Sequence, residues 1–327
     1  MSLSVAASAE AVAERMPALP PVLTELLRAR GVHTAQQVQE FLHPSFDALL
    51  DPYSMLGMDV AVSRIQQAIA RREEILLYGD YDVDGTLAVV LLKTALESLG
   101  AICRFHIPHR LRDGYGMQAS AIAQAAADGV QLVISVDNGI RAFAAADEAQ
   151  RLGLDLIITD HHLPDAAQGL PAALAILNPN QPGCTYPCKH LCGAGVAFKL
   201  AQALLEAQDR ERARSKILPS FLKLLALATV ADSVPLLGEN RAIVALGIEQ
   251  LAQPVHPGLR ALFVLAEIDA SSACCSTLRR SSFRRWSFSA RLRAWVASRV
   301  VKSSTTSLAA PMRPAALRRG AMRKAMS

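Results

Sequence analysis

Acidic residues are absent from the last part of the chain. Residues 271–327 contain 11 Arg and 2 Lys but no Asp or Glu, which leaves 21 of the 34 basic residues and all 29 acidic residues in 1–270. The net charge of +5 therefore combines an acidic body of net charge −8 with a basic tail. The tail also lacks a sustained apolar period. We interpret it either as a disordered basic extension that contacts nucleic acid or, because the composition changes abruptly, preferably as the translation of a shifted reading frame.

Long apolar runs and closely spaced cysteines are also missing. No run approaches the roughly 18 apolar residues of a membrane span, so no membrane partner is expected. The first residues are rich in Ala but include Glu10, Glu14 and Arg15, which interrupt the apolar stretch that a signal peptide needs. Six cysteines in 327 residues do not form the dense framework of a small secreted domain. We therefore expect a cytoplasmic protein with reduced thiols.

Strand-like and helix-like segments alternate through the middle of the chain. Strands are expected at 74–78, 102–107, 131–136 and 155–159, and helices at 86–99, 120–128 (with Ser120 as its N-cap) and 142–152. This alternation predicts an α/β fold in which helices flank a parallel sheet. After Pro182 the pattern becomes helical, at about 196–206, 221–230 and 241–251. The expected domains are a helical N-terminal extension (1–55), a catalytic domain with a helical C-terminal part (56–270) and the tail (271–327), which is expected to be disordered.

Acidic and imidazole side chains follow three of the expected strands. They are Asp80, Asp82 and Asp84 after the first strand, Asp137 after the third, and Asp160, His161 and His162 after the fourth. Because the carboxyl ends of parallel strands share one edge of a sheet, these groups should converge there. Carboxylates about 4 Å apart repel each other by roughly 4 kcal/mol per pair at an effective dielectric of 20, unless they bind protons or cations. The pattern therefore predicts a divalent metal site.

Other interpretations of the acidic motifs are less favoured. Asp80-x-Asp82-x-Asp84-Gly85 copies the start of an EF-hand loop, but the twelfth position, which needs a bidentate Glu, is Leu91. Capping of the next helix would explain one carboxylate but not three. Asp137-Asn138-Gly139 by itself would be an ordinary turn, and adjacent histidines are often surface residues.

Three further segments permit binding sites. Cys184, Cys188 and Cys192, with His190 between them, invite a zinc hypothesis, although their spacing matches no usual zinc motif and buried or loop thiols are the favoured interpretation. Gly193-Ala194-Gly195, ahead of a helix that contains Lys199, could hold a phosphate or simply start that helix. The basic segment 104–112 could bind phosphates or be a solvated loop.

Six motifs together resemble the DHH phosphoesterase superfamily and, within it, the RecJ type of bacterial single-strand-specific exonuclease. The resemblance runs from about residue 20 to about 268. The motifs are Tyr78–Thr86, Asp113–Gly116, Ser135–Gly139, Thr159–His162, Leu191–Lys199 and Ala228–Asp232.

The resemblance implies a centre of two Mn²⁺ or Mg²⁺ ions. Its implied ligands are Asp82, Asp84, Asp137, His161 and Asp232, with Asp80 in or just behind the ligand set. Asp137 would bridge the ions, His162 would face the scissile phosphate, and Asp160 would orient the histidines. Carboxylates with one imidazole suit Mn²⁺ or Mg²⁺, and two such ions support phosphodiester hydrolysis. The expected substrate-binding residues are Arg110, Arg112, Tyr115, Asn138, Gly193 and Gly195.

The implied activity is 5′-to-3′ exonuclease action on single-stranded DNA in recombination and repair. A single-strand-binding protein and a helicase are the partners that the resemblance implies. Because the motifs of a second, DHH-associated domain are not found in this chain, loss of the exonuclease activity is also expected as an outcome. The alternatives are a small DHH phosphatase that acts on pyrophosphate, oligonucleotides or cyclic dinucleotides, a non-enzymatic DHH scaffold, and the inert product of a broken gene.

Overall fold

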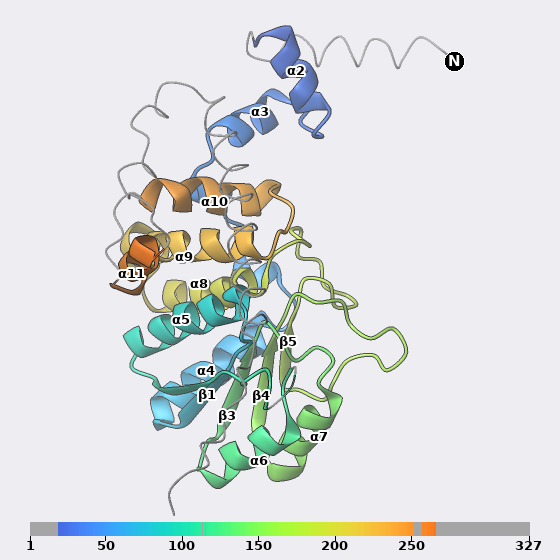
Figure 1. The fold of residues 1–327 in the computed structure, drawn as a ribbon, viewed down its shortest axis with the longest axis vertical. Coiled ribbons are helices and arrows are strands. Elements are labelled where there is room, and N and C mark those ends of the chain that lie inside the picture. The colour runs from blue at the N-terminus through green and yellow to red at the C-terminus, as the bar shows by residue number, and fades with distance from the viewer. Residues whose placement is uncertain (1–18, 113, 115, 252–256, 266–327) are drawn as a thin grey trace, which may run out of the picture.

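The computed structural model describes residues 19–112, 114, 116–251 and 257–265, and its centre is a five-stranded parallel sheet (Figure 1). The strands are β1 (Glu74–Tyr78), β2 (Ile102–His106), β3 (Leu132–Val136), β4 (Asp155–Thr159) and β5 (Ala175–Leu177). Their order across the sheet is β2-β1-β3-β4-β5, and every neighbouring pair is parallel. The predicted α/β fold with a parallel sheet is therefore confirmed.

Helices cover both faces of the sheet. On one face lie α4 (Met58–Arg71), α5 (Val83–Ser98) and α8 (Gly193–Arg212), and on the other lie α6 (Ala119–Ala127) and α7 (Phe143–Leu152) (Figure 1). Successive side chains of a strand point to opposite faces, so Leu77 of β1 enters the first core and Leu76 the second. This burial on both faces explains why the strands are nearly continuous apolar runs in the sequence.

The direction in which successive strands are added to the sheet reverses after β2, so that β1 and β3 lie side by side at the switch. The connection from β1 through α5 to β2 runs over one face, whereas those through α6 and α7 run over the other. The loops that follow β1 and β3 therefore diverge to opposite faces of the sheet. Such a switch point leaves a crevice at the carboxyl ends of the strands, where α/β proteins bind ligands.

The helical part that follows the sheet stacks on the layer of α5 and α8. Helices α9 (Leu218–Ala231), α10 (Gly238–Gln250) and α11 (Pro257–Leu265) belong to it, and a π-helical turn (Ala213–Ile217) joins α8 to α9 (Figure 1). The three predicted helices in this region are confirmed. None of the helices in the described part of the chain is both long and apolar enough to cross a bilayer.

The described part of the N-terminal extension contains short helices. They are α2 (Pro21–Arg28) and α3 (Ala35–Leu42), followed by the 3₁₀ turns Phe46–Ala48 and Pro52–Ser54. Helix α3 begins with a capping box, in which Thr34 and Gln37 satisfy each other's backbone N–H groups. The Arg241 guanidinium of α10 stacks on the Phe41 ring at 3.6 Å and donates to the Phe41 carbonyl at 2.7 Å. Residues 1–18 and the predicted tail 271–327 lie outside the described residues.

One predicted detail of the elements is wrong. Ser120 does not cap α6, because that helix begins at Ala119 with Gln118 as its N-cap, and no side chain caps it. Helix α4 and strand β5 were not predicted from the sequence. Strand β5 has only three residues, too few to produce a recognisable period.

Candidate metal centre

The loop after β1 sends its acidic side chains in different directions. Asp82 caps α5 by accepting the Gly85 N–H at 2.8 Å, and its side chain lies on the surface. Asp84, in the first turn of α5, is buried and accepts the N–H groups of Gly193 at 2.6 Å and Ala194 at 2.9 Å. Asp84 thus joins the start of α5 to the start of α8, where the positive end of the helix favours a carboxylate.

Asp137 follows β3 in a backbone conformation that few residues adopt. Its φ is +62°, in the left-handed region, and its side chain is only 2% exposed. A Cβ on Gly193 would lie 2.3 Å from Asp137 Oδ1, so the start of α8 can approach this carboxylate only because residue 193 is glycine. Backbone strain of this kind at a buried carboxylate is typical of functional sites.

His161 brings the carboxylates together. Its Nε2 lies 3.3 Å from Asp137 Oδ1, 3.8 Å from Asp232 Oδ2 and 4.0 Å from Asp84 Oδ2. Asp232 comes from the end of α9, far from the other three groups in sequence. Two triads therefore have ligand atoms close enough to share a cation, Asp84 with His161 and Asp232, and Asp137 with His161 and His162.

The electrostatics of this cluster favour a cation. Burial, followed by the charges of Asp84 and Asp82, raises the pKa of Asp137 to about 11. Burial also raises the pKa of Asp84, and burial with the charge of Asp84 raises the pKa of Asp232 to about 6. Among the described residues, Asp137 Oδ1 and Asp232 Oδ2 are buried without a hydrogen-bond partner. Buried oxygen ligands with one imidazole fit Mn²⁺ or Mg²⁺, so these residues suit the divalent ion that the sequence predicts.

Asp160 and His162 form a hydrogen-bonded pair beside the cluster. Asp160 Oδ1 lies 2.7 Å from His162 Nδ1, and its other oxygen accepts the Ile140 N–H at 3.0 Å. Burial works to raise the pKa of Asp160, but the hydrogen bond and charge of His162 prevail and lower it, and the same hydrogen bond raises the pKa of His162. Since Asp160 engages Nδ1, the Nε2 atom of the half-exposed His162 ring is left for a ligand.

Two asparagines that were not predicted from the sequence donate hydrogen bonds to the loop that carries His161 and His162. Asn178 donates to the His162 carbonyl at 2.8 Å, and Asn180 donates to the His161 carbonyl at 2.9 Å. Both residues follow β5, and Asn178 is fully buried. The segment Asn178-Pro179-Asn180 is a turn signal in the sequence, but without β5 it could not be assigned to this edge of the sheet.

The predicted ligands differ in how far the structure brings them together. Asp84, Asp137, His161 and Asp232 converge. Asp80 is buried behind them, accepts the Tyr81 N–H at 2.6 Å and has a pKa that burial raises. Asp80 and Asp82 belong to neither triad of the described residues.

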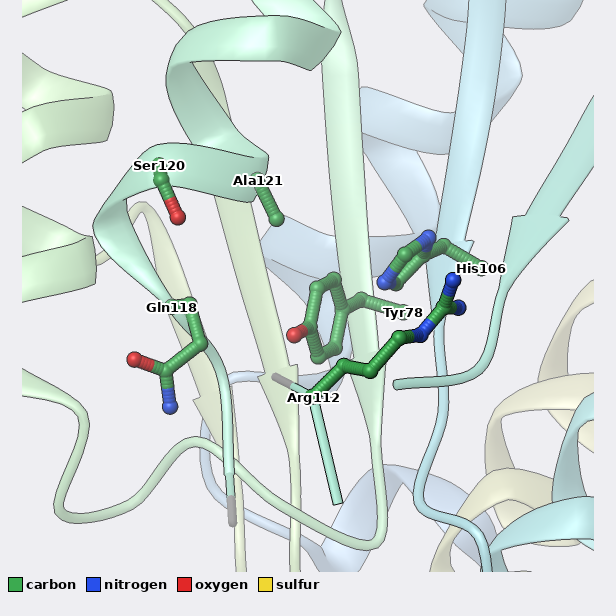
Figure 2. Close-up of a pocket in the computed structure, with 6 residues that line it drawn as sticks. All are labelled: Tyr78, His106, Arg112, Gln118, Ser120 and Ala121. Atoms are coloured by element: carbon green, nitrogen blue, oxygen red, sulfur yellow. The ribbon is translucent and has the colours of Figure 1, made fainter. Parts of the chain in front are cut away.

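The predicted substrate-binding residues lie in several settings. Arg110 stacks over the Tyr81 ring at 5.1 Å, Arg112 lines a cavity shown in Figure 2, and Tyr115 is outside the described residues. The Asn138 side chain donates to the Val136 carbonyl at 3.0 Å, inside the fold. Gly193 and Gly195 are buried at the start of α8.

Three alternative sites, namely a phosphate cradle, a zinc site and an EF-hand, find no support in these contacts. The N–H groups of Gly193 and Ala194 already bind Asp84, and Lys199 is buried in an ion pair with Glu239 at 2.7 Å, so neither has the arrangement of a phosphate cradle. Cys192 is buried against Thr229 at 3.7 Å, and the described residues offer no cysteine-containing triad of metal ligands. Leu91, at the Glu position of an EF-hand, is buried in α5.

Comparison with known proteins identifies relatives of this chain. Residues 74–229 match the DHH family, N-terminal domain. The single-stranded-DNA-specific exonuclease RecJ of Bacillus subtilis (strain 168) is 44% identical over 255 residues, which cover 78% of this chain and 31% of that protein. The RecJ of Escherichia coli (strain K12) is 39% identical over 268 residues, covering 80% and 45%. The chain thus spans less than half the length of these relatives.

Solved structures agree with this fold. A crystal structure of exonuclease RecJ bound to manganese matches with a TM-score of 0.60 and 27% identity, covering 77% of this chain and 68% of that one. RecJ from Thermus thermophilus in complex with Mn²⁺ also matches with a TM-score of 0.60, over 89% of this chain and 46% of that one, and its 24% identity supports the fold alone. With the domain match and the sequence relatives, these similarities show that the chain belongs to the DHH family and is a relative of the RecJ exonucleases.

Proposed function

We propose that this protein is a metal-dependent exonuclease that hydrolyses single-stranded DNA in the 5′-to-3′ direction, in recombination and repair. The observation that carries the proposal is the convergence of Asp84, Asp137 and Asp232 on His161, with two buried carboxylate oxygens lacking a partner among the described residues. The relatives named above, which are single-stranded-DNA-specific exonucleases, supply the substrate class.

In this proposal, one set of residues would bind the metal ions and another would contact the phosphate. Asp84, Asp137, His161 and Asp232 would hold two Mn²⁺ or Mg²⁺ ions, with Asp80 and Asp82 completing the set as the loop adjusts. Bound ions of this kind neutralise phosphate charge and increase the acidity of water. Asp160 holds His162 at Nδ1, and this would leave Nε2 to face a phosphate oxygen of the substrate. A protonated His162 can donate a hydrogen bond or a proton there.

The test is strand cleavage by the purified chain with Mn²⁺. Single-stranded DNA labelled at the 5′ end should release a labelled mononucleotide at once, whereas the same strand labelled at the 3′ end should shorten progressively. Asp137→Ala should abolish both signals while the protein still folds, and Asp147→Ala, on an exposed position of α7, is the matched control.

Other substrates distinguish the remaining candidates. Because the family match is confined to residues 74–229, a phosphatase that needs only this domain is the second candidate, and turnover of pyrophosphate or cyclic dinucleotides without strand cleavage would favour it. Absence of turnover on every substrate would contradict both enzymatic proposals and leave a scaffold or an inert product. The cytoplasmic location and the partnership with a single-strand-binding protein and a helicase are proposed with the exonuclease and depend on it.

A further inference from the structure

Side chains fix the backbone of the two histidines from both sides. Asn180 donates to the His161 carbonyl at 2.9 Å, and Asn178 donates to the His162 carbonyl at 2.8 Å. The N–H groups of both histidines donate to Asp160 Oδ1, at 2.7 and 3.1 Å. This segment follows β4 and belongs to no strand or helix. Side-chain hydrogen bonds therefore take the place of the backbone bonds of regular structure.

The asparagine turn is anchored independently of the histidines. Asn178 directly follows β5, its side chain is fully buried, and its Oδ1 accepts the Asn180 N–H at 2.7 Å. The Lys189 ammonium donates to the Pro179 carbonyl at 2.7 Å and to the Cys184 carbonyl at 2.8 Å. Strand β5 itself pairs with β4. The turn is therefore a fixed support, and the histidine backbone that it contacts takes its position from the sheet.

The two histidine rings depend on this support to different degrees. Asp160 Oδ1 lies 2.7 Å from His162 Nδ1, so a carboxylate orients the His162 ring directly. Among the described residues, no hydrogen-bond partner holds Nδ1 of His161, whose Nε2 lies among the carboxylates. Metal-binding histidines usually donate their second ring nitrogen to a protein oxygen or to water. Because the part of the chain that the structure describes offers no such oxygen, the place of the His161 ring depends on its backbone.

We infer that Asn180 is a positioning residue, which holds the His161 carbonyl and thereby keeps Nε2 of His161 in the metal cluster. This inference rests on the proposed function for the identity of the ion. The groups of such a site must lie within about 0.5 Å of their productive positions, and His161 Nε2 lies 3.3 Å from Asp137 Oδ1 and 3.8 Å from Asp232 Oδ2. Asn180 is half-buried, and the hydrogen bond of its side chain within the described ranges is the one to His161. Its amide therefore acts on the cluster through this histidine.

Mn²⁺ binding to the full, metal-free chain tests this role without substrate. Asn180→Ala should weaken the Mn²⁺ affinity measured by calorimetry about tenfold, as removal of a residue that orients a metal ligand does. In pulsed electron paramagnetic resonance of the wild type saturated with Mn²⁺, the His161 nitrogen should couple to the ion. Asn180→Ala should lose this coupling, which His161→Ala identifies. Gln124→Ala is the matched control, because it removes an amide that donates to Asp128 at 2.8 Å at the surface end of α6.

A second variant keeps the size of the side chain. Asn180→Asp replaces the donating amide by an acceptor, so it should also lose the nitrogen coupling, although its added charge by itself favours the cation. A role in stability alone would lower the urea concentration at which Asn180→Ala unfolds in EDTA, while the Mn²⁺ affinity and the nitrogen coupling would equal those of Gln124→Ala. That result would overturn the inference.

The inference and the proposed function can fail separately. Cleavage of single-stranded DNA by the wild type, together with Mn²⁺ binding that does not depend on Asn180, would overturn the inference and leave the proposed function standing. Mn²⁺ binding that depends on Asn180, together with no cleavage by the wild type, would contradict the proposed function and support the positioning role.

Discussion

Replacement of Asp137 by Asn should stabilise the metal-free protein while abolishing its response to metal. The buried Asp137 carboxyl has its pKa raised from 3.8 to about 11, by burial first and then by neighbouring carboxylates. At pH 7 the folded protein therefore retains a proton that the unfolded chain has released. One pH unit corresponds to about 1.4 kcal/mol, so the 3.2 units between 3.8 and 7 amount to a cost of roughly 4 kcal/mol at most.

Asn has the shape of the protonated acid and carries no charge, so it removes this cost. We expect Asp137→Asn to raise the free energy of unfolding in EDTA at pH 7 by about 2–4 kcal/mol, the lower value applying if local relaxation already reduces the repulsion. The sign of the pH dependence follows from the raised pKa. The difference from the wild type should disappear below about pH 4, where both states hold the proton, and grow by about 1.4 kcal/mol per unit above it.

The measurement is urea unfolding of both proteins in EDTA at pH 5, 6 and 7, repeated with Mn²⁺ at pH 7. Mn²⁺ at about 100 times its dissociation constant should stabilise the wild type by roughly 2.7 kcal/mol and leave Asp137→Asn unchanged. Asp147→Asn, on an exposed position of α7, controls for the substitution. If Asp137→Asn unfolds at the same urea concentration as the wild type at all three pH values, the reasoning about the buried carboxylates is wrong.

Three further substitutions test other contacts. Gly193→Ala places a Cβ 2.3 Å from an oxygen of Asp137. It should lower the Mn²⁺ affinity measured by calorimetry at least tenfold and lower the free energy of unfolding by about 1–3 kcal/mol through overpacking. Unchanged affinity would show that the close approach of α8 does not position the Asp137 carboxylate. Lys199→Met leaves Glu239 buried without its partner and should destabilise the protein by about 3–5 kcal/mol in urea unfolding, a loss that Glu239→Gln in the same chain should partly reverse. Arg104→Ala should leave the affinity for a fluorescein-labelled oligothymidylate unchanged when binding is followed by fluorescence anisotropy in EDTA. Arg104 pairs with Glu74 and Asp128 near the start of β1, away from the carboxyl ends of the strands where the metal cluster lies. Weaker binding would show that this arginine contacts the substrate.

The ends of β1, β3 and β4 could be predicted because each of these strands is a short apolar run that is buried on both faces and lies next to glycine or acidic residues. The position of Asp137 and His161 directly after such runs was enough to place them at one edge. The exposed and half-exposed strand β2 was also found, since its apolar residues adjoin Gly100. Strand β5 was missed because of its length, whereas helix α4 was missed although its buried residues, Ala61, Ile65 and Ala68 among them, recur at helical spacing.

The sequence by itself determined that acidic and imidazole groups follow successive strands, because strand period and turn residues are local properties. Only the tertiary structure decided which of these groups lie close enough together to share a cation. Asp232 reaches the cluster from the end of α9, Gly193 lets α8 approach Asp137, and Asp84 is oriented by that helix rather than by its own loop. These contacts join residues many positions apart, and they depend on how the helices pack against the sheet, which no local pattern records.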